Sequence, residues 1–216
     1  MNYLPPADTG LDLIYVDDCL LAVNKPAGLL SVPGRGEDKQ DCLLSRVQQR
    51  FPDALTAHRL DMGTSGLIVF ARGKEMESRL FRLFRDRATS KRYQAVVAGR
   101  PAKESGSIEL PLICDWPNRP RQKVDFEIGK PSLTHYRVLA YDPASDTSRL
   151  ELEPVTGRSH QLRVHLAALG HPILGDELYG GAVAEAALRL LLHATDLRLP
   201  HPSTAAIVDF HCPAPF

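Results

Sequence analysis

Short apolar runs of strand length recur along the chain and are separated by turn residues. They lie at residues 11–15, 20–24, 67–71, 93–98, 133–140, 149–153, 189–199 and 206–211. The run at 67–71 is continuously apolar, which is typical of a strand buried on both faces. Asp17 and Asp18 separate the first two runs and predict a tight hairpin turn. The pattern therefore predicts a sheet that takes up most of the chain.

Only three stretches have the spacing of a helix. The first runs from Asp41, its predicted N-cap, to about Arg50, and the last covers residues 161–169, ending before Gly170. The middle one, residues 74–87, places apolar side chains on one face and arginines on the other. Strands with few helices predict an α+β fold, a mainly antiparallel mixed sheet with a few flanking helices and loops.

The length of 216 residues fits one large domain or two small ones. We predict an N-terminal extension at residues 1–10 and one domain over residues 11–216. Residues 101–130 are rich in proline and predict an irregular excursion with short strands.

Charge and cysteine usage limit the classes of function. Lys plus Arg equals Asp plus Glu at 26 each, which counts against an unselective nucleic-acid binder. Residues 72–92 are nevertheless locally basic. The four cysteines are far apart and not at zinc-finger spacing, so we expect free thiols and a cytoplasmic protein. No apolar run reaches the roughly 20 residues of a membrane span.

Two polar segments are candidates for chemistry. Residues 58–66 place His58, Arg59 and Asp61 on a glycine-containing loop before the buried run, where catalytic groups are common. An ordinary turn with Asp61 as a capping acid is the alternative. Residues 156–165 carry Arg158 and Arg163, and here the alternative is a solvated helix start with two satisfied histidines. The spacing of His160 and His165 fits no metal triad. The sequence also lacks the motifs of nucleophile-elbow hydrolases, zinc deaminases and P-loop proteins.

Five segments together resemble the RluA family of pseudouridine synthases. They are Asn24-Lys25-Pro26-Ala27-Gly28, His58-Arg59-Leu60-Asp61 with Thr64-Ser65-Gly66, Lys91-Arg92-Tyr93, residues 157–165 and Arg189-Leu190-Leu191-Leu192-His193-Ala194. All five occur in the order of the family, and the resemblance runs from about Leu11 to the end. It implies the pseudouridine synthase catalytic fold without an S4-type domain.

The resemblance implies three catalytic residues. Asp61 matches the essential aspartate, which either attacks C1′ of the nucleotide or takes a proton from the sugar, and the sequence leaves both routes open. Arg163 matches the arginine that pairs with this aspartate, and Tyr93 matches the tyrosine against the uracil ring. The resemblance implies no cofactor and no metal.

The resemblance also implies RNA as the substrate: 23S rRNA, the anticodon stem-loop of tRNA, or both. The target nucleotide must leave its stack, and Arg59 is expected to fill the gap. The expected substrate-binding residues are Arg59, Leu192, His58, Arg158, Arg79 and Arg82. For Tyr93 and Leu192 simple core packing is the alternative, and for the arginines of residues 79–87 it is a solvated face with pairs such as Glu75–Arg79. A second candidate patch for RNA contacts lies beside Trp116 and consists of Arg119, Arg121 and Lys123, but its motif is weaker evidence. We expect a monomer without a membrane or an obligatory protein partner.

Two other classes of function remain to be weighed. An RNA-binding or assembly factor with the same fold would be expected to lose one of Asp61, Tyr93 and Arg163, yet all three are present. A sugar or nucleoside hydrolase needs a second carboxylate near the first. Asp53 is the only acid within ten residues of Asp61, so this class has little support.

Overall fold

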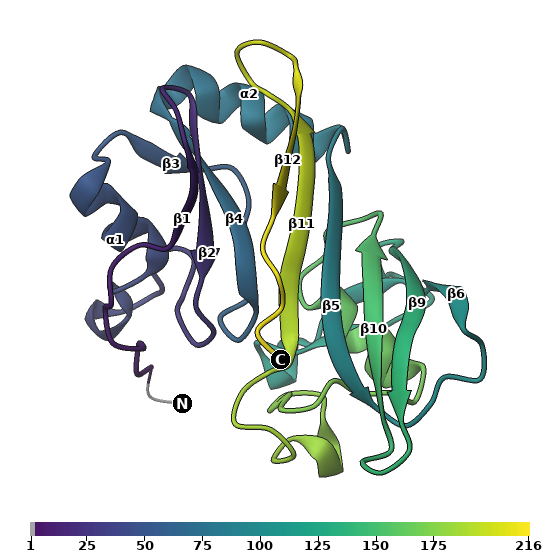
Figure 1. The fold of residues 1–216 in the computed structure, drawn as a ribbon. Helices are drawn as coiled ribbons and strands as arrows, with labels where there is room; N and C mark the ends of the chain where they lie inside the picture. Colours follow the sequence, from purple (N-terminus) through teal and green to yellow (C-terminus); the bar gives the residue numbers. More distant parts are fainter. Residues whose placement is uncertain (1–2) are drawn as a thin grey trace. The chain divides into compact units, whose positions relative to one another are not determined.

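The computed structural model describes residues 3–216, which fold as two compact units (Figure 1). The first unit contains the chain up to Lys91 together with His193–Pro215, and the second contains Arg92–Leu192 and Phe216. The predicted extension at residues 1–10 and the single catalytic domain stay predictions, and residues 1–2 lie outside the described part.

The strands of the first unit confirm a mixed, mainly antiparallel sheet. They are β1 (Leu13–Val16), β2 (Leu20–Lys25), β3 (Ala54–Thr56), β4 (Ser65–Arg72), β11 (Leu192–Pro200) and β12 (Ile207–His211). β2 pairs antiparallel with β1 and β4, β3 with β4, and β12 with β11. β4 and β11 are parallel where His193 and Ala194 lie opposite Ser65 and Gly66. The predicted hairpin forms because Asp17 accepts the backbone N–H groups of Cys19 and Leu20, each at 2.8 Å.

β4 is buried along nearly its whole length, as its apolar sequence predicts. Gly66 sits at φ 106°, and a Cβ atom there would collide with the backbone of Ala194 in β11. The close approach of these two strands therefore requires glycine at position 66. This close approach fixes the place where the loop that carries Asp61, five positions earlier, joins the sheet.

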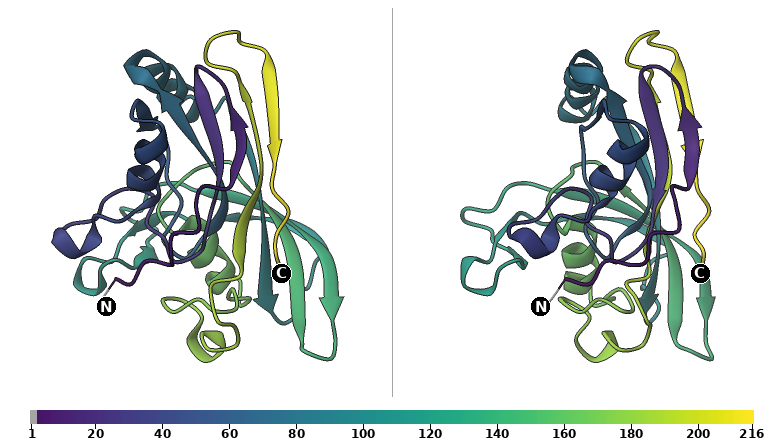
Figure 2. Two further views of the ribbon diagram at one scale, coloured as in Figure 1. Left: turned by 60° about the vertical axis from the view of Figure 1, so that its left-hand side comes forward. Right: turned by 90° about the vertical axis from the view of Figure 1, so that its left-hand side faces the viewer.

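Two helices of the first unit lie on the same side of its strands (Figure 2). They are α1 (Leu43–Arg50) and α2 (Gly73–Arg85). The prediction that Asp41 caps α1 is wrong. The cap is Cys42, whose sulfur accepts the N–H of Ser45 while the Ser45 hydroxyl accepts the N–H of Cys42. This capping box leaves the Asp41 carboxylate to bind Arg46 at 2.8 Å.

The second unit contains an antiparallel sheet, a short ribbon and one helix. The sheet runs in the order β5 (Ser90–Ala98), β10 (Thr147–Pro154), β9 (Leu133–Asp142), β6 (Ser105–Glu109). The ribbon pairs β7 (Leu112–Cys114) with β8 (Gln122–Val124), so the predicted excursion with short strands is confirmed. α3 (Gln161–Ala168) contacts β8, β9 and β10. Leu150, Leu152, Leu166 and Ile173 form the centre of the core.

The predicted strand at residues 189–199 begins later than expected, at Leu192. The preceding residue, Leu191, donates its N–H to the carbonyl of Leu174 and so belongs to a loop contact. Three single-turn 3₁₀ helices were not predicted, namely Glu37–Lys39, Trp116–Asn118 and Gly181–Val183.

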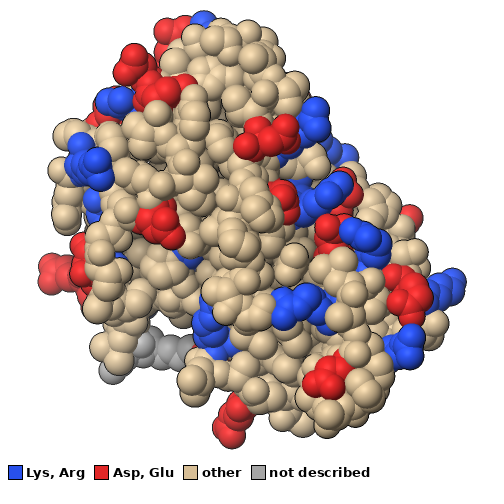
Figure 3. All heavy atoms as spheres, viewed as in Figure 1, with Lys and Arg blue, Asp and Glu red and all other residues tan. Residues whose placement is uncertain are grey.

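The surface agrees with the balanced composition. On the face that Figure 3 shows, basic and acidic side chains are interspersed and neither forms a continuous patch. Over residues 3–216, no helix has the length and apolar character needed to cross a membrane.

Candidate active site

The loop that carries Asp61 leads directly into β4. Asp61 is partly exposed and lies between Leu60, which is 8% exposed, and Met62, which is 41% exposed. Its carbonyl accepts the N–H of Thr64 at 3.1 Å, which closes a tight turn. The side chains on either side of Asp61 therefore lie in different environments, with Leu60 buried and Met62 exposed.

Lys25, at the end of β2, fixes the residue after Asp61. Its side chain is 0% exposed, and its Nζ donates to the carbonyls of Met62 (3.0 Å), Leu29 (2.6 Å) and Pro26 (2.9 Å). A buried ammonium is stable only when its protons are bound in this way. Lys25 therefore ties two separate loops to one point.

Ser31 fixes the residue before Asp61. Its hydroxyl donates to the carbonyl of Leu60 at 2.7 Å and accepts the N–H of the same residue at 3.1 Å. Together with Lys25, it holds the backbone on both sides of Asp61. Such support from outside the reacting group is what keeps a catalytic side chain in one geometry.

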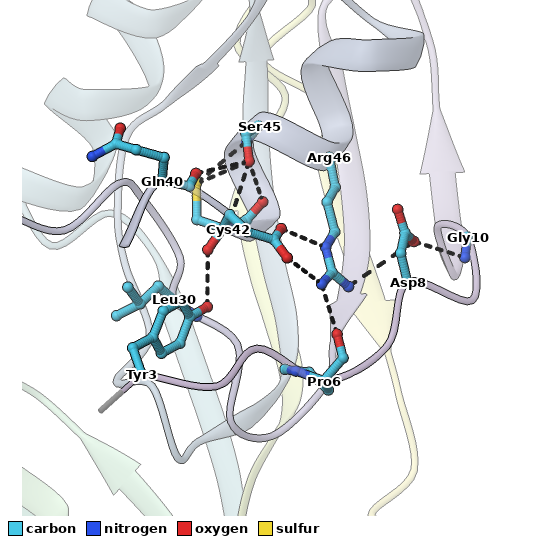
Figure 4. A network of polar contacts seen from close by, with 10 residues as sticks. Tyr3, Pro6, Asp8, Gly10, Leu30, Gln40, Cys42, Ser45 and Arg46 are labelled. Atoms are coloured by element: carbon cyan, nitrogen blue, oxygen red, sulfur yellow. Dashed lines mark hydrogen bonds and ion pairs between the residues drawn. The ribbon is translucent and has the colours of Figure 1, made fainter. Parts of the chain in front are cut away.

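The segment before Ser31 is held in turn by residues 3–8, the N-terminal strap (Figure 4). The hydroxyl of Tyr3 accepts the N–H of Leu30 at 3.1 Å and donates to the carbonyl of Asp41 at 2.9 Å. Arg46 donates to the carbonyl of Pro6 at 2.7 Å as well as to Asp41. The strap thus connects the start of α1 with the loop that supports Leu60.

His58 anchors the other end of the candidate loop. Its Nε2 accepts the N–H of Val69 at 3.0 Å, and its ring stacks on Phe84 of α2 with the centroids 4.3 Å apart. Burial lowers the pKa of His58 to about 3, and the charge of Lys91 acts in the same direction. His58 is therefore neutral at ordinary pH, with its proton on Nδ1 so that Nε2 can accept.

A pH effect on stability follows from this anchor. Because the folded-state pKa of His58 lies below its ordinary value of 6.5, folding favours the neutral ring. The stabilisation is complete above pH 6.5 and falls by about 1.4 kcal/mol per pH unit as the pH drops toward 3. We expect the free energy of unfolding, measured with urea, to decline more steeply between pH 6 and pH 4 for the wild type than for His58→Gln. Parallel declines would contradict this assignment.

The basic residues near this loop differ in their contacts. Arg59 is exposed. On α2, Arg79 binds Glu75 at 2.6 Å and the carbonyl of Pro202 at 3.0 Å, so the expected Glu75–Arg79 pair is present. Arg82 is exposed, and no carboxylate of the described residues lies within 4.0 Å of its guanidinium. Arg82 is therefore more available to a phosphate than Arg79.

Arg163 forms a buried ion pair in the second unit. Its Nε and Nη2 donate to the two carboxylate oxygens of Asp176 at 2.8 and 2.7 Å, and the two residues are 7% and 1% exposed. Burial alone would raise the pKa of Asp176, but the hydrogen bonds and charge of Arg163, with the N–H groups of Leu178 and Tyr179, hold it below its usual range. The guanidinium is thus fixed in one orientation.

Tyr179 supports the same guanidinium. The centre of its ring lies 5.1 Å from the Arg163 guanidinium carbon, within the range of a cation–π contact. Its hydroxyl contacts Nδ1 of His160 and accepts the N–H of Gln122, both at 2.7 Å. His165 is also hydrogen-bonded, to Ser132 and Thr134. Both histidines of this segment are therefore satisfied, as the alternative interpretation expected. The start of α3 is buried, however, and is not the solvated helix start of that interpretation.

The remaining candidates of the second unit lie near its core. Tyr93 in β5 is half-buried and packs against the core, opposite Leu152 of β10. Leu192 is 2% exposed and belongs to that core. Arg158 is partly buried, and its Nε donates to the carbonyl of Pro131 at 3.3 Å. These positions suit packing, and their contact with a substrate stays a prediction.

The candidates form two groups, one in each unit. Asp61, His58, Arg59, Arg79 and Arg82 belong to the first unit. The second unit contains Tyr93, Arg158, Arg163 and Leu192. The pairing of Asp61 with Arg163 stays a prediction.

The sequence did not assign roles to four residues of these groups, namely Lys25, Ser31, Asp176 and Tyr179. For Asp176 a signal was present, because an aspartate in a turn commonly accepts the N–H groups that follow it, as Asp176 does for those of Leu178 and Tyr179.

One further cluster has the chemistry of metal ligands. Ligand atoms of Asp17, Cys19 and His201 lie within 4.8 Å of one another in the first unit. Asp17 already accepts the Tyr15 hydroxyl at 2.7 Å and contacts Nε2 of His201 at 2.8 Å, and its other oxygen caps the hairpin turn. These hydrogen bonds explain why the side chains lie together, because they link the hairpin turn at Asp17 to the turn at His201.

The chain is similar to known proteins over its full length. The family model described as RNA pseudouridylate synthase matches residues 19–168. The dual-specificity RNA pseudouridine synthase RluA of Escherichia coli K12 is 53% identical over 216 residues, covering 100% of this chain and 98% of that protein. The Pasteurella multocida protein of the same description is 51% identical over 217 residues, covering 100% and 99%.

Solved structures give the same result. Human RNA pseudouridylate synthase domain containing 1 matches with a TM-score of 0.82 at 32% identity, covering 99% of this chain and 87% of that chain. Human RNA pseudouridylate synthase domain containing 4 matches with a TM-score of 0.73 at 26% identity, covering 94% of this chain and 88% of that chain. With a family model over most of its length and relatives of more than 50% identity, the chain belongs to the RNA pseudouridylate synthase family, whose members are isomerases.

Proposed function

We propose that this protein converts uridine to pseudouridine in 23S rRNA and in the anticodon stem-loop of tRNA. The observation that carries the proposal is the likeness, over the full length of the chain, to enzymes described as dual-specificity RNA pseudouridine synthases. The restrained loop around Asp61 supports it, because Lys25 and Ser31 hold both neighbours of a partly exposed carboxylate.

Asp61 starts the reaction in this proposal. The isomerisation breaks the bond between C1′ and N1, turns the uracil and joins C1′ to C5, from which a proton leaves. A carboxylate begins this either as a nucleophile at C1′ or as a base toward the sugar. Both routes need an ionised Asp61 and a nucleotide extruded from its stack.

Residues of the second unit complete the proposed chemistry. Arg163 pairs with Asp61 and orients its carboxylate, as the fixed donors of a guanidinium do for a carboxylate. Tyr93 lies against the uracil, with its hydroxyl available to help remove the C5 proton, and Leu192 borders the base. The bidentate Asp176 contact, which fixes the direction of the Arg163 guanidinium, supports this role for Arg163.

Arg59, Arg158 and His58 belong to the proposed RNA-binding residues. Arg59 is exposed beside Asp61 and fills the gap that the target nucleotide leaves, which offsets part of an unstacking cost of a few kcal/mol. Arg158 and His58 act mainly by holding their loops, because their side chains bond the carbonyl of Pro131 and the N–H of Val69.

We also propose that the protein acts in the cytoplasm as a monomer, with no cofactor, membrane or obligatory protein partner. Cys19, Cys42, Cys114 and Cys212 are free thiols, which is typical of a reducing compartment. Light scattering of the purified protein tests the oligomeric state, for which the expected mass is 23.8 kDa.

The experiment that tests the function is a map of pseudouridine in total rRNA and tRNA from cells with and without the gene. We expect at least one site in each class of RNA to lose its modification in the deletion strain and to regain it with the wild-type gene. Maps that do not differ would overturn the proposal. Loss in only one class would overturn the dual specificity.

α2 provides a test of RNA binding. We expect the double variant Arg79→Glu/Arg82→Glu to bind substrate RNA more weakly and to reduce the slope of log affinity against log salt by about two, because each phosphate contact releases counterions. Filter binding at several salt concentrations measures this slope. The matched control is Arg137→Glu/Arg198→Glu, which changes the same charge at other exposed positions. An unchanged slope in the α2 variant would remove this helix from the binding surface.

A further inference from the structure

Residues 112–130 of the second unit, here called the Trp116 lobe, expose an unusual amount of apolar surface. Trp116 is 64% exposed, Phe126 78% and Ile128 71%. Exposed large apolar groups that lie close along one short segment are typical of a binding surface. The lobe consists of the β7–β8 ribbon, the turn between its strands and the turn that follows.

Two arginines of the lobe have no carboxylate partner among the described residues, whereas Lys123 pairs with Asp125 at 3.6 Å. The guanidinium carbon of Arg119 lies 4.5 Å from the centre of the Trp116 ring, a cation–π distance. Among residues 3–216 no carboxylate lies within 4.0 Å of the guanidinium of Arg119 or Arg121. Asp115, the acid beside Trp116 in sequence, binds the neutral amide of Asn118 at 2.9 Å and neither arginine. An exposed indole with an arginine on it is therefore left for an external partner.

Internal hydrogen bonds hold the lobe in its shape. The N–H groups of Asp115 and Arg121 donate to the carbonyls of Arg121 and Asn118, at 2.9 and 3.0 Å. Asp125 accepts the N–H groups of Glu127 and Ile128, each at 3.0 Å, and so fixes the turn that presents Phe126. A surface that is already ordered loses little conformational entropy on binding.

We propose that the Trp116 lobe binds unpaired bases of the substrate RNA, with Trp116 and Arg119 as its stacking platform. Aromatic rings and guanidinium planes stack on unpaired bases, and exposed cations contact the phosphates. A protein partner would need only the apolar groups, whereas the arginine stacked on the ring favours a nucleobase. The proposal rests on RNA being the substrate, but it does not depend on the role of Asp61.

The lobe shares a support with Arg163, which gives the proposal a consequence for catalysis. The N–H of Gln122, in β8, donates to the hydroxyl of Tyr179, and the ring of Tyr179 contacts the Arg163 guanidinium. All of these residues belong to the second unit. RNA held on the lobe is therefore bound to residues that are connected through Tyr179 to Arg163.

Tryptophan fluorescence tests the proposal directly, because Trp116 is the only tryptophan in the chain. The wild-type protein is titrated with a tRNA anticodon stem-loop and with a blunt duplex of the same length. We expect the stem-loop to quench the emission of Trp116 as it binds, since a stacked base quenches an indole, and the duplex to leave it unchanged. A stem-loop that binds in a filter assay without quenching would overturn the proposal.

Variants provide the second arm. We expect Trp116→Ala and Arg119→Ala each to weaken binding of the stem-loop by about tenfold, the loss typical of one stacked base, and Trp116→Phe to retain most of the affinity. Leu188→Ala removes an apolar side chain that is exposed in the same unit and should bind as the wild type does. Thermal melting checks that all four variants fold.

The possible outcomes separate this proposal from the proposed function. If stem-loop affinity is unchanged in Trp116→Ala, the lobe does not bind RNA, and the proposal fails whatever the enzyme's activity. If affinity falls as expected but the protein forms no pseudouridine in that RNA, the proposed function fails while the binding surface remains supported.

Discussion

Asp61→Asn is expected to lower pseudouridine formation by about 10⁴-fold or more while RNA binding stays within twofold of the wild type. Removal of a nucleophile or general base typically has an effect of this size. Asparagine has nearly the same shape, so the contacts of Leu60 with Ser31 and of Met62 with Lys25 should persist. Release of tritium from uridine labelled at C5 measures the reaction, because the C5 proton leaves when C5 joins C1′.

A matched variant shows whether the effect belongs to the site. Asp53→Asn also removes a carboxylate from the first unit, but Asp53 is exposed and binds Arg72 at 3.1 Å. Exposed pairs contribute little to stability, so this variant should keep full activity. If Asp61→Asn released tritium at the wild-type rate, Asp61 would not be the catalytic carboxylate. If Asp53→Asn were equally inactive, loss of charge alone would explain both results.

The sheet could be predicted from the sequence because its signal is local. Strand-length apolar runs predicted β4, β5, β9 and β10 to within a few residues at each end. β3 has only three residues, Ala54–Thr56, and is a strand because β4 lies beside it, so no local pattern could reveal it. The cap of α1 depended on Cys42, an unusual capping residue, and the usual preference for aspartate gave the wrong position.

The support of the candidate site could not be predicted, because its bonds connect positions far apart in sequence. Lys25 binds the carbonyl of a residue 37 positions later, and Ser31 binds one 29 positions later. Both bonds are made to backbone carbonyls, which every residue has, so the type of residue at the partner position gives no signal. The resemblance to a family pointed to Lys25 as part of a motif, but only the fold shows that it holds Met62.

The pair of Arg163 and Asp176 leads to the second large prediction, which concerns stability and activity together. Arg163→Met leaves Asp176, which is 1% exposed, without its cation. Breaking a buried pair in this way typically costs about 3–5 kcal/mol. We expect a loss of this size in the free energy of unfolding at pH 7, measured with urea, and loss of isomerisation.

The pH dependence of this loss has a definite sign. In the wild type Arg163 holds the pKa of Asp176 below its usual value of 3.8, so the stabilisation is present above about pH 4 and is lost as the pH falls further. In Arg163→Met, burial without the cation raises the pKa of Asp176 instead. The carboxyl then takes up a proton as the pH falls toward 4, and the stability difference from the wild type should shrink. A difference that grows on acidification would contradict this account.

A double variant separates the structural role of Arg163 from its proposed role in catalysis. Asp176→Asn removes the buried charge, while the amide oxygen can still accept the N–H groups of Leu178 and Tyr179. Arg163→Met/Asp176→Asn should therefore recover most of the stability that Arg163→Met loses. If Arg163 acts on the catalytic carboxylate, the recovered protein remains inactive, since no guanidinium is left to pair with that carboxylate. Recovery of activity together with stability would show that Arg163 serves only to hold the fold of the second unit.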